Sequence, residues 1–449
     1  SEMLLGMLLL LSFLFSRFYL SNKTSRAKVQ AMSPYFSINL DHGGMPATDQ
    51  ADSGRCWMFG TLNLFRFGTR TKLNLDDFEF SESYLLFYWL LEQVNFILEC
   101  FIETADQSLE DNRLLAMFLD DPVDDGGDWG IAVNLIQKYG LVPKDVYPES
   151  FSSGYTAEVD AFLNQMVRHT AFDIRNALAA DVTNVETARQ LKWKCVGDCH
   201  RVLTIHLGTP PTPSSTFDWQ WRDRLDNFHT LTKWSPHEFA INYVTVPFAS
   251  YVSLIQDPRH EYYHRYQVEY SMPLCGGNPL QFLNIPAKEM KAMALAMLQD
   301  GLPVLFACIA EAELDNQDGL WDAALYETTE FYGIDSLTPM SKAERIRYGS
   351  CMGDHIMLFT GVDVSDDDGS VRCWRVENSW GTQDAGNDGY YTINDNWFND
   401  NVFEIVAPPS YLSEAAAEGM TTPVRKLPAW DPMCSAGKRS RRKRSYKRR

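Results

Sequence analysis

The short stretch QADSGRC, at positions 50–56, contains residues whose types and spacing could carry out a chemical reaction. An apolar run follows Cys56, and its spacing predicts a buried helix that carries the cysteine on its first turn. The positive end of a helix dipole stabilises the thiolate form of a cysteine placed there. The side-chain N–H of Gln50, with the backbone N–H of Cys56, could stabilise an oxyanion. The stretch predicts a thiol nucleophile, although a lone cysteine before a helix is more often a structural core residue.

A histidine and an asparagine near the end of the chain supply the partners that such a nucleophile needs. His355 begins one predicted apolar strand, and Asn378 ends the next. Adjacent antiparallel strands can bring the two side chains within hydrogen-bonding distance. His355 would take the proton from Cys56 and later protonate the leaving amine. Asn378 would fix the imidazole tautomer, and Trp380 would shield that hydrogen bond from water.

Two adjacent glycines, Gly126 and Gly127, are the predicted substrate contact. They lie in a turn-rich loop before a short helix that is expected to stop at Gly140. Without side chains, they let the backbone approach an extended peptide and pair with it as a strand would. Taken alone, such a pair is more often a turn.

The hydrophobic patterns place these residues in a helical part and a β-rich part of the chain. Residues 50–150 are predicted to be mostly helical, with Ser81 as the N-cap of a long apolar helix. Residues 150–285 are also predicted to be predominantly helical, and a methionine stripe after Pro286 is typical of a core-facing helix. Strands are predicted near 304–309, 355–364, 371–378, 389–393 and 402–407. This order predicts an α+β fold with two lobes and a cleft between them.

The charge distribution limits the classes of partner. The 449 residues carry a formal charge of −19, and residues 434–449 hold nine basic and no acidic side chains. The rest of the chain therefore holds 31 basic and 59 acidic residues, which give it a formal charge of −28. Such a body repels polyanions, so nucleic acid could bind only through the basic tail.

The cysteines predict a reducing compartment and no metal site. Nine cysteines without framework spacing are typical of a cytoplasmic protein. Cys195, Cys199 and His200 form a C-x3-C-H cluster, but no second ligand pair lies nearby in the sequence. We therefore expect a structural loop or helix surface at this point, and no cofactor.

The N-terminal end favours a different location. Residues 3–15 are apolar apart from Gly6 and Ser12, which is the length of a signal-peptide hydrophobic region and short for a membrane span. Glu2 stands where a signal peptide usually has a positive charge. We expect a cytoplasmic protein without a stable membrane partner, and secretion or membrane association as the alternative.

Four motifs resemble those of one known family. They are SGRCW at 53–57, DGG at 125–127, WRVENSWG at 374–381 and LPAWDPM at 427–433. They are similar to the motifs of the bleomycin hydrolases, which are papain-like cysteine aminopeptidases, and the similarity runs from about residue 45 to 433. Cys56 and His355 are 299 residues apart, against roughly 130–150 in ordinary papain-like enzymes. The surplus fits the large helical insertion that this family carries.

The resemblance implies an enzyme that trims residues from peptide N-termini and hydrolyses related amides such as bleomycin. It implies a homohexameric ring with an internal chamber, and a C-terminal arm lying in the chain's own cleft. One departure is that sixteen residues follow Met433, whereas family members usually end four residues after the Asp-Pro-Met. The implied segments are an N-terminal segment 1–44, a helical lobe with the nucleophile 45–150, a helical insertion 151–302, a β-rich lobe 303–410, a C-terminal arm 411–433 and a basic tail 434–449.

Two other functions use some of the same features. One is a ring-shaped nucleic-acid-binding protein that makes its contacts through residues 438–449, which the charge of the body disfavours. The other is an acyltransferase such as a transglutaminase, which uses the same cysteine and histidine chemistry. Asn378 favours the peptidase, because transglutaminases place an aspartate in that role.

Overall fold

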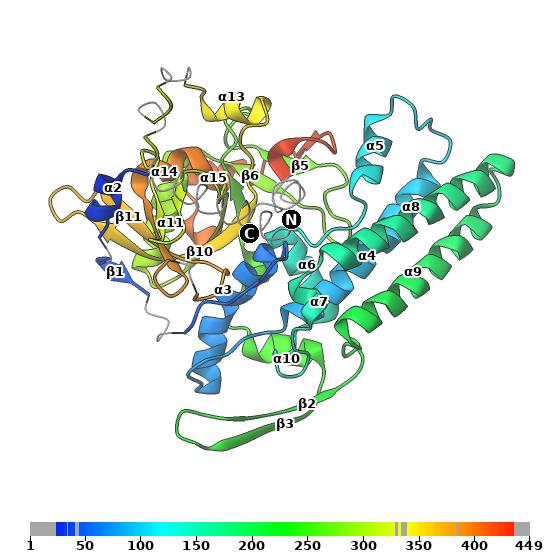
Figure 1. Ribbon diagram of the computed structural model, residues 1–449, viewed down its shortest axis with the longest axis horizontal. Coiled ribbons are helices and arrows are strands. Elements are labelled where there is room, and N and C mark those ends of the chain that lie inside the picture. The colour runs from blue at the N-terminus through cyan, green and yellow to red at the C-terminus, as the bar shows by residue number, and fades with distance from the viewer. Residues whose placement is uncertain are drawn as a thin grey trace, which may run out of the picture.

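The computed structural model describes residues 24–33, 35–40, 45–327, 331–333, 339–383 and 386–434 (Figure 1). The apolar run at 3–15 and the tail at 435–449 lie outside these ranges, so the expectations about them remain predictions. Within the described ranges, one helix, α4 (Glu82–Glu103), is long and apolar enough to cross a membrane. Its apolar window is 78% buried inside the protein, as in the core helix of a globular fold.

Three helices form the part of the structure that carries Cys56. They are α3 (Cys56–Leu73), α4 and α6 (Trp129–Tyr139). Ser81 caps α4 as predicted, because its side chain accepts a hydrogen bond from the backbone N–H of Tyr84. Asp128 caps α6 in the same way, and α6 ends at Gly140 as predicted.

A long helical hairpin lies along α4. It consists of α8 (Ala157–Ala180) and α9 (Val185–Leu207), which extend together to one side of the molecule (Figure 1). The buried residues of α8 recur every three or four positions, for example Leu163, Val167 and Ile174. That spacing places them on one face, which packs into the same hydrophobic core as α4.

The β-rich part is a twelve-stranded sheet with the order β14-β5-β6-β4-β13-β7-β10-β11-β12-β9-β8, and β1 pairs with β10. The predicted strands are confirmed as β7 (Val304–Cys308), β10 (His355–Val364), β11 (Val371–Glu377), β12 (Tyr390–Asn394) and β13 (Val402–Ala407). These five strands are antiparallel neighbours in the order β13-β7-β10-β11-β12.

The central strand β10 is buried on both faces, because a different helix covers each. Ile356 and Leu358 belong to the hydrophobic core that contains α3, whereas Met357 and Phe359 belong to the core that contains α11 (Ala287–Gln299). Successive residues of a strand point to opposite faces, so β10 separates the two cores. The predicted methionine stripe of α11 is buried in the second core.

The prediction that residues 150–285 are predominantly helical is wrong beyond Leu207. The segment continues as β2 (Phe217–Arg222), β3 (Phe228–Trp234), β4 (Val252–Ile255), β5 (Arg265–Val268) and β6 (Phe282–Asn284). Strands β4 to β6 have only three or four residues each, which is too short to show an alternating pattern. Strand β6 pairs with β4 and β5, whose other partners, β13 and β14, lie far along the chain.

Shorter elements complete the described chain. They are α2 (Arg26–Ala31), β1 (Ile38–Asn39), α5 (Arg113–Asp120), α7 (Phe151–Gly154), α10 (Pro236–Tyr243), β8 (Leu314–Asp315), β9 (Leu320–Trp321), α13 (Lys342–Arg347), α14 (Asp395–Asn401), α15 (Glu414–Gly419) and β14 (Arg425–Leu427).

Candidate active site

The thiol of Cys56 lies where α3 meets the central sheet. Cys56 is the first residue of α3 and is 4% exposed. One turn later, Gly60 packs so closely on β10 that a Cβ would lie 3.0 Å from Cγ2 of Ile356, the neighbour of His355. Cys308 is the strand partner of His355. Burial raises the pKa of Cys308 well above its usual range, and its electrostatic interactions with Asp354 and with Cys56 raise it further. Cys56 therefore lies at the end of β10 that carries the histidine.

His355 and Asn378 meet across β10 and β11. The Nε2 atom of His355 lies 2.7 Å from Oδ1 of Asn378, and the two residues are 5% and 1% exposed. A proton on Nε2 would donate to the asparagine oxygen and leave Nδ1 as the acceptor nitrogen of the neutral ring. The Trp380 ring stacks on the imidazole, with 4.8 Å between centroids and 30° between planes. The structure thus places the tryptophan as the sequence predicts, over the histidine.

Gln50 is held between the nucleophile loop and the segment after Asn378. Its Nε2 donates to the backbone oxygen of Ser53 over 2.7 Å, and its Oε1 accepts from the hydroxyl of Ser379 over 2.7 Å. The backbone N–H of Gln50 also donates to the backbone oxygen of Ser379 over 2.9 Å. An amide nitrogen carries two hydrogens, so the contact with Ser53 leaves the second N–H of Gln50 for a substrate oxygen.

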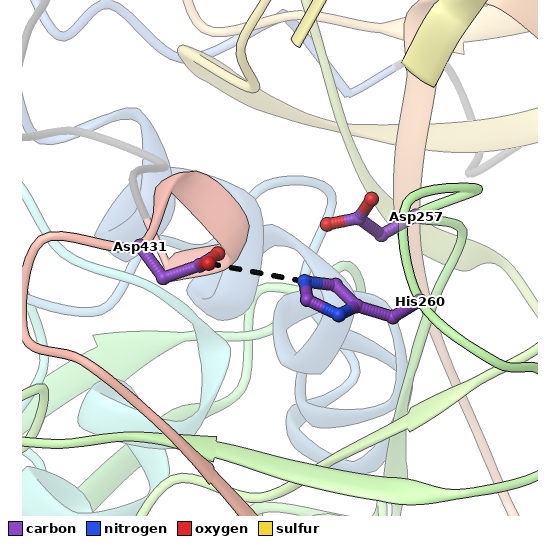
Figure 2. A group of neighbouring side chains, drawn as sticks. All are labelled: Asp257, His260 and Asp431. Carbon is purple, nitrogen blue, oxygen red and sulfur yellow. Dashed lines mark ion pairs between the residues drawn. The ribbon is translucent and has the colours of Figure 1, made fainter. Parts of the chain in front are cut away.

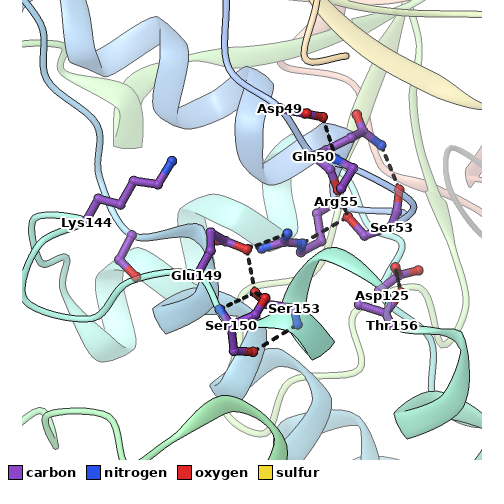
Figure 3. Close-up of polar contacts among 12 residues, drawn as sticks. Asp49, Gln50, Ser53, Arg55, Asp125, Lys144, Glu149, Ser150, Ser153 and Thr156 are labelled. Atoms are coloured by element: carbon purple, nitrogen blue, oxygen red, sulfur yellow. Dashed lines mark hydrogen bonds and ion pairs between the residues drawn. The ribbon is translucent and has the colours of Figure 1, made fainter. Parts of the chain in front are cut away.

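An ion pair that the sequence analysis did not identify fixes the loop before Cys56. Arg55 is fully buried, and its guanidinium forms two hydrogen bonds with the carboxylate of Glu149, 2.9 and 2.7 Å long (Figure 3). Burial alone would raise the pKa of Glu149, but the charge and hydrogen bonds of Arg55 lower it below its usual value. Arg55 also donates to Ser53 over 3.0 Å. Because Arg55 and Glu149 lie far apart in the sequence, no local pattern reveals the pair.

The predicted glycines lie in a loop that packs against α3 and α4. Gly126 uses both its backbone groups within the protein, since its N–H donates to Asp124 over 2.7 Å and its C=O accepts from Trp89 over 2.9 Å. Gly127 lies against the indole of Trp57, and a Cβ would come within 2.6 Å of that ring. Within the described residues, the backbone N–H and C=O of Gly127 have no hydrogen-bond partner. Gly127 can therefore offer its backbone to a peptide, whereas Gly126 holds the loop.

The same loop is tied directly to the nucleophile stretch. One carboxylate oxygen of Asp125 accepts a hydrogen bond from the hydroxyl of Thr156 (Figure 3). The same oxygen accepts another from the backbone N–H of Gly54. The backbone oxygen of Asp125 accepts from the indole N–H of Trp57 over 2.9 Å. The two segments flanking the thiol are thus positioned relative to each other by buried hydrogen bonds.

A cavity beside the start of β10 receives the C-terminal arm. It is lined by Ala307, Gly353, Phe403, Glu404 and Met433, among others. Ala307 is the strand partner of Ile356, and Gly353 lies two residues before His355. The side chain of Met433, which comes from the arm, is 6% exposed. The described end of the chain therefore reaches the neighbourhood of the candidate catalytic residues.

Glu404 places a buried carboxyl group in the wall of this cavity. It is 4% exposed and accepts a hydrogen bond from Ser253 over 2.6 Å. Burial raises the pKa of Glu404 to about 8, and the negative charge of Asp128 raises it further. Its protonation therefore changes within the range in which most enzymes work.

An ion-pair cluster anchors the arm just before Met433. The guanidinium of Arg259 donates to Asp431 over 2.7 Å and to Asp257 over 2.6 Å. His260 also lies beside Asp431, with 3.8 Å between its Nε2 and the carboxylate (Figure 2). Burial alone would raise the pKa of Asp431, but the nearby His260 and the hydrogen bonds from the Met433 backbone and the Arg259 guanidinium lower it to about 2.

Asp257, His260 and Asp431 also have the spacing of a metal site. Both carboxylates are already bound by the Arg259 guanidinium, which supplies the positive charge that a cation would otherwise bring. We therefore assign the cluster to holding the arm. The sequence analysis missed it because Arg259 and Asp431 lie far apart in the chain.

Comparisons with known proteins show the family of the chain. The family model described as Peptidase C1-like family matches residues 17–434. Bleomycin hydrolase of Homo sapiens is 37% identical over 414 residues, which are 91% of this chain and 90% of the relative. Aminopeptidase C of Listeria monocytogenes is 35% identical over 420 residues, which are 92% of this chain and 90% of the relative.

A solved structure extends the likeness to the fold. The crystal structure of PepW from Lactobacillus rhamnosis matches with a TM-score of 0.85 and 35% identity, and the match covers 92% of this chain and 91% of that one. The resemblance inferred from four motifs thus holds over nearly the whole sequence. The chain belongs to the Peptidase C1-like family and is a papain-like cysteine peptidase.

Proposed function

We propose that this peptidase is a cysteine aminopeptidase that removes N-terminal residues from peptides and hydrolyses related amides such as bleomycin. The observation that carries the proposal is the buried pair of His355 and Asn378, 2.7 Å apart, at the end of β10 where α3 begins with Cys56. The relatives named bleomycin hydrolase and aminopeptidase C support the same reaction.

The reaction follows from the positions of four side chains. The Cys56 thiolate attacks the carbonyl carbon of the scissile amide, and His355 holds the proton that the thiol has lost. The backbone N–H of Cys56 and the side-chain N–H of Gln50 stabilise the negative oxygen of the tetrahedral intermediate. His355 then gives its proton to the leaving amine, which departs and leaves a thioester on Cys56. Water, deprotonated by His355, attacks the thioester and releases the acid and the free thiol.

The role of Asn378 is to orient the imidazole. Its Oδ1 accepts from Nε2 of His355 and also from the backbone N–H of Ser379 over 2.8 Å. Two donors thus hold Oδ1 of Asn378 in place, and the His355 imidazole cannot rotate without losing a buried hydrogen bond. Trp380 covers the same bond and keeps water from competing for it.

The C-terminal arm supports selectivity for peptide N-termini. Asp431 is held by Arg259, and Met433 fills part of the cavity beside Gly353. An arm in this position blocks the cleft beyond the first residues of a substrate, so only a chain end could reach Cys56. The substrate backbone would pair with Gly127, whose N–H and C=O lack partners among the described residues.

We further propose the organisation that the bleomycin hydrolase resemblance implies. The fold has two lobes with the cleft between them, and residues 151–302 are an insertion relative to simpler papain-like peptidases. The protein assembles as a homohexameric ring in the cytoplasm, with its active sites facing an internal chamber. Peptides that enter the chamber are its partners. Sedimentation velocity of the purified protein tests the hexamer.

A pair of substrates tests the activity and the end selectivity together. An aminoacyl fluorogenic amide should be hydrolysed, and its N-acetylated twin should react about 10–100-fold more slowly, the loss expected when one hydrogen bond to a charged group disappears. Equal rates on both substrates would remove the aminopeptidase proposal but keep a peptidase. Failure on both, with a folded protein and an unmodified Cys56, would contradict the reaction itself.

One variant tests the arm in the same assay. Asp431→Asn removes the charge that binds Arg259, so the arm should leave the cleft more often and the acetylated substrate should react faster. Asp368→Asn is a matched control, because Asp368 is an exposed aspartate in the hairpin turn between β10 and β11. An unchanged ratio between the two substrates in Asp431→Asn would show that the arm does not set the selectivity.

A further inference from the structure

Three sulfur atoms gather between α8 and α9, away from the candidate active site. Cys195 and Cys199 lie one turn apart on α9, and their Sγ atoms are 3.9 Å from each other. Met166 of α8 faces them, with its Sδ 4.0 Å from Sγ of Cys199. The sequence pattern predicted a loop or helix surface here. The cysteines instead lie inside the hairpin, at 5% and 0% exposure.

The distances fit one ion bound by three sulfurs. Metal–thiolate bonds are about 2.3 Å long, as known for zinc. Three ligands at that distance around one trigonal ion stand about 4 Å from one another. The separations of 3.9 Å between the cysteines and 4.0 Å between Cys199 and Met166 are two sides of such a triangle. The Cys199 sulfur therefore stands at a ligand-to-ligand distance from each of the other two sulfurs.

The ligand types decide which ion fits. Thiolate and thioether sulfurs are soft ligands that select Cu(I) over harder cations such as magnesium or calcium. Structural zinc sites take four cysteine or histidine ligands in a tetrahedron, whereas a thioether stands in the third place here. We propose that Cys195, Cys199 and Met166 form a three-coordinate binding site for Cu(I).

A cavity gives the ion a path to the sulfurs. Its volume is about 220 Å³, and its lining includes Met166, His169, Lys194 and Cys195. Cys195 is thus shared between the cavity and the buried sulfur cluster, while Cys199 is closed off behind it. An ion that enters would meet Cys195 and Met166 at the cavity wall, with Cys199 behind them. The third sulfur comes from the preceding helix, and for this reason the C-x3-C spacing alone did not predict a site.

Metal titration of the full-length protein tests the site. The background is Cys56→Ala, so that the candidate nucleophile cannot bind the ion. Under anaerobic conditions, Cu(I) is titrated against a chromophoric Cu(I) chelator, and the protein should withdraw one equivalent. X-ray absorption of the loaded protein should show sulfur scatterers at about 2.3 Å.

Three variants test whether the proposed ligands bind the ion. Cys195→Ser and Cys199→Ser should each abolish the withdrawal of Cu(I). Met166→Leu keeps the side-chain volume and should weaken binding by at least about 10–100-fold, the loss that follows even from mutating residues that only support a ligand. Cys373→Ser, in β11, is the control for losing one buried cysteine. Thermal unfolding of each variant shows whether it is folded.

The outcomes are decisive in both directions. Loss of one equivalent in the α9 variants and its retention in Cys373→Ser support the site. Equal Cu(I) binding by all folded variants would overturn it, as would an unchanged affinity in Met166→Leu. Zn(II) binding with the same variant dependence and higher affinity would replace the soft-ion assignment. These results do not depend on peptidase activity, so they stand apart from the proposed function.

Discussion

The hydroxyl of Ser379 donates to Oε1 of Gln50 over 2.7 Å, which joins the candidate oxyanion donor to the residue that follows Asn378. Both side chains are buried, at 2% and 5% exposure. Because the oxygen end of the Gln50 amide accepts from Ser379 and the nitrogen end donates to Ser53, the amide has one orientation. The segment that orients the histidine therefore also orients the oxyanion donor.

This relationship predicts the effect of Ser379→Ala. Removing Gln50 itself should lower kcat by roughly 10²–10³, as for other oxyanion-hole donors. Ser379→Ala keeps the Gln50 amide but removes the hydrogen bond that orients it. The fall in kcat should therefore be smaller, about tenfold, with KM little changed. The kinetics of Gln50→Ala, Ser379→Ala and the double variant give the measurement. Since both single changes act through one amide, the double variant should be no worse than Gln50→Ala. Additive losses would mean that Ser379 acts elsewhere.

A second prediction concerns the thiol. Cys56→Ala should abolish turnover and rapid labelling by iodoacetamide at neutral pH, because the start of α3 and the nearby His355 favour its thiolate. Burial raises the pKa of Cys100 and of Cys373 to about 12, so these thiols should react slowly.

Two controls complete the labelling experiment. Cys275 is half-buried and desolvation raises its pKa, so Cys275→Ala should leave the fast labelling unchanged. A hydrogen bond from Cys199 lowers the pKa of Cys195 to about 7, but Cys195 is 95% covered, and its alkylation should be slow. Peptide mass mapping after short exposure identifies the labelled residue. Activity retained by Cys56→Ala would show that the nucleophile is elsewhere.

A third prediction separates the roles of the two partners. His355→Ala should be nearly as damaging as Cys56→Ala, because in the proposed reaction His355 both takes the proton from the thiol and gives it to the leaving amine. Asn378→Ala should leave partial activity, since the imidazole remains and Trp380 still packs on it. Single-turnover measurements on folded variants give the comparison. Equal and total loss on both changes would contradict this division of roles.

The sequence predicted the site better than the segments around it. Cys56, His355 and Asn378 could be identified because chemistry fixes their residue types and because β10 and β11 carry strong strand patterns. Strands β4 to β6 could not be predicted, since three or four residues show no period and the outside partners of β4 and β5, which are β13 and β14, lie far along the chain. The ion pair of Arg259 and Asp431 could not be predicted either, because the two residues lie far apart in the sequence.

The glycine pair shows a different limit. The sequence treated Gly126 and Gly127 as equal, because both lack a side chain. In the fold, position 127 must be glycine because a side chain there would clash with the Trp57 ring. The backbone groups of Gly126 instead form hydrogen bonds with Asp124 and Trp89. These contacts come in part from Trp57 of α3 and Trp89 of α4, which lie far from the glycines in the sequence, so the sequence alone could not separate the two positions.

A fourth prediction concerns stability and pH. Burial, and then the charge of Asp128, raise the pKa of Glu404 from 4.5 in the unfolded chain to about 8 in the folded protein. Between about pH 4.5 and 8 the folded state therefore holds a proton that the unfolded state lacks, and the free energy of unfolding falls as pH rises. The slope from this group is at most about 1.4 kcal/mol per pH unit.

Glu404→Gln removes that slope and keeps an oxygen that can accept from Ser253. The difference in free energy of unfolding between variant and wild type should shift in favour of the variant as pH rises from 5 to 8. Urea unfolding at several pH values measures it. Glu82, whose pKa burial also raises to about 8, contributes to both proteins and cancels in the difference. A constant difference across the pH range would mean that Glu404 titrates normally.

The last prediction concerns the residues beyond the arm. Asp431 is fixed by Arg259, and Met433 is buried in the cavity next to the start of β10. Sixteen residues follow Met433, and nine of them are basic. If they continue along the cleft, they occupy the space that a substrate needs, and they lie within reach of Cys56.

An active enzyme should remove this obstruction by cutting its own tail from the C-terminal side. Purified wild-type protein should then lack some or all of residues 437–449, whereas Cys56→Ala protein should keep them and bind polyanions more tightly at low salt, where basic side chains are least screened. Intact mass measurement of both proteins decides the matter. Cleavage in both would point to a contaminating protease, and wild type incubated with Cys56→Ala shows whether the cut is made within one chain. A full-length and fully active wild type would mean that the chain turns out of the cleft after Met433, because a threaded tail and free access of substrate to Cys56 exclude each other.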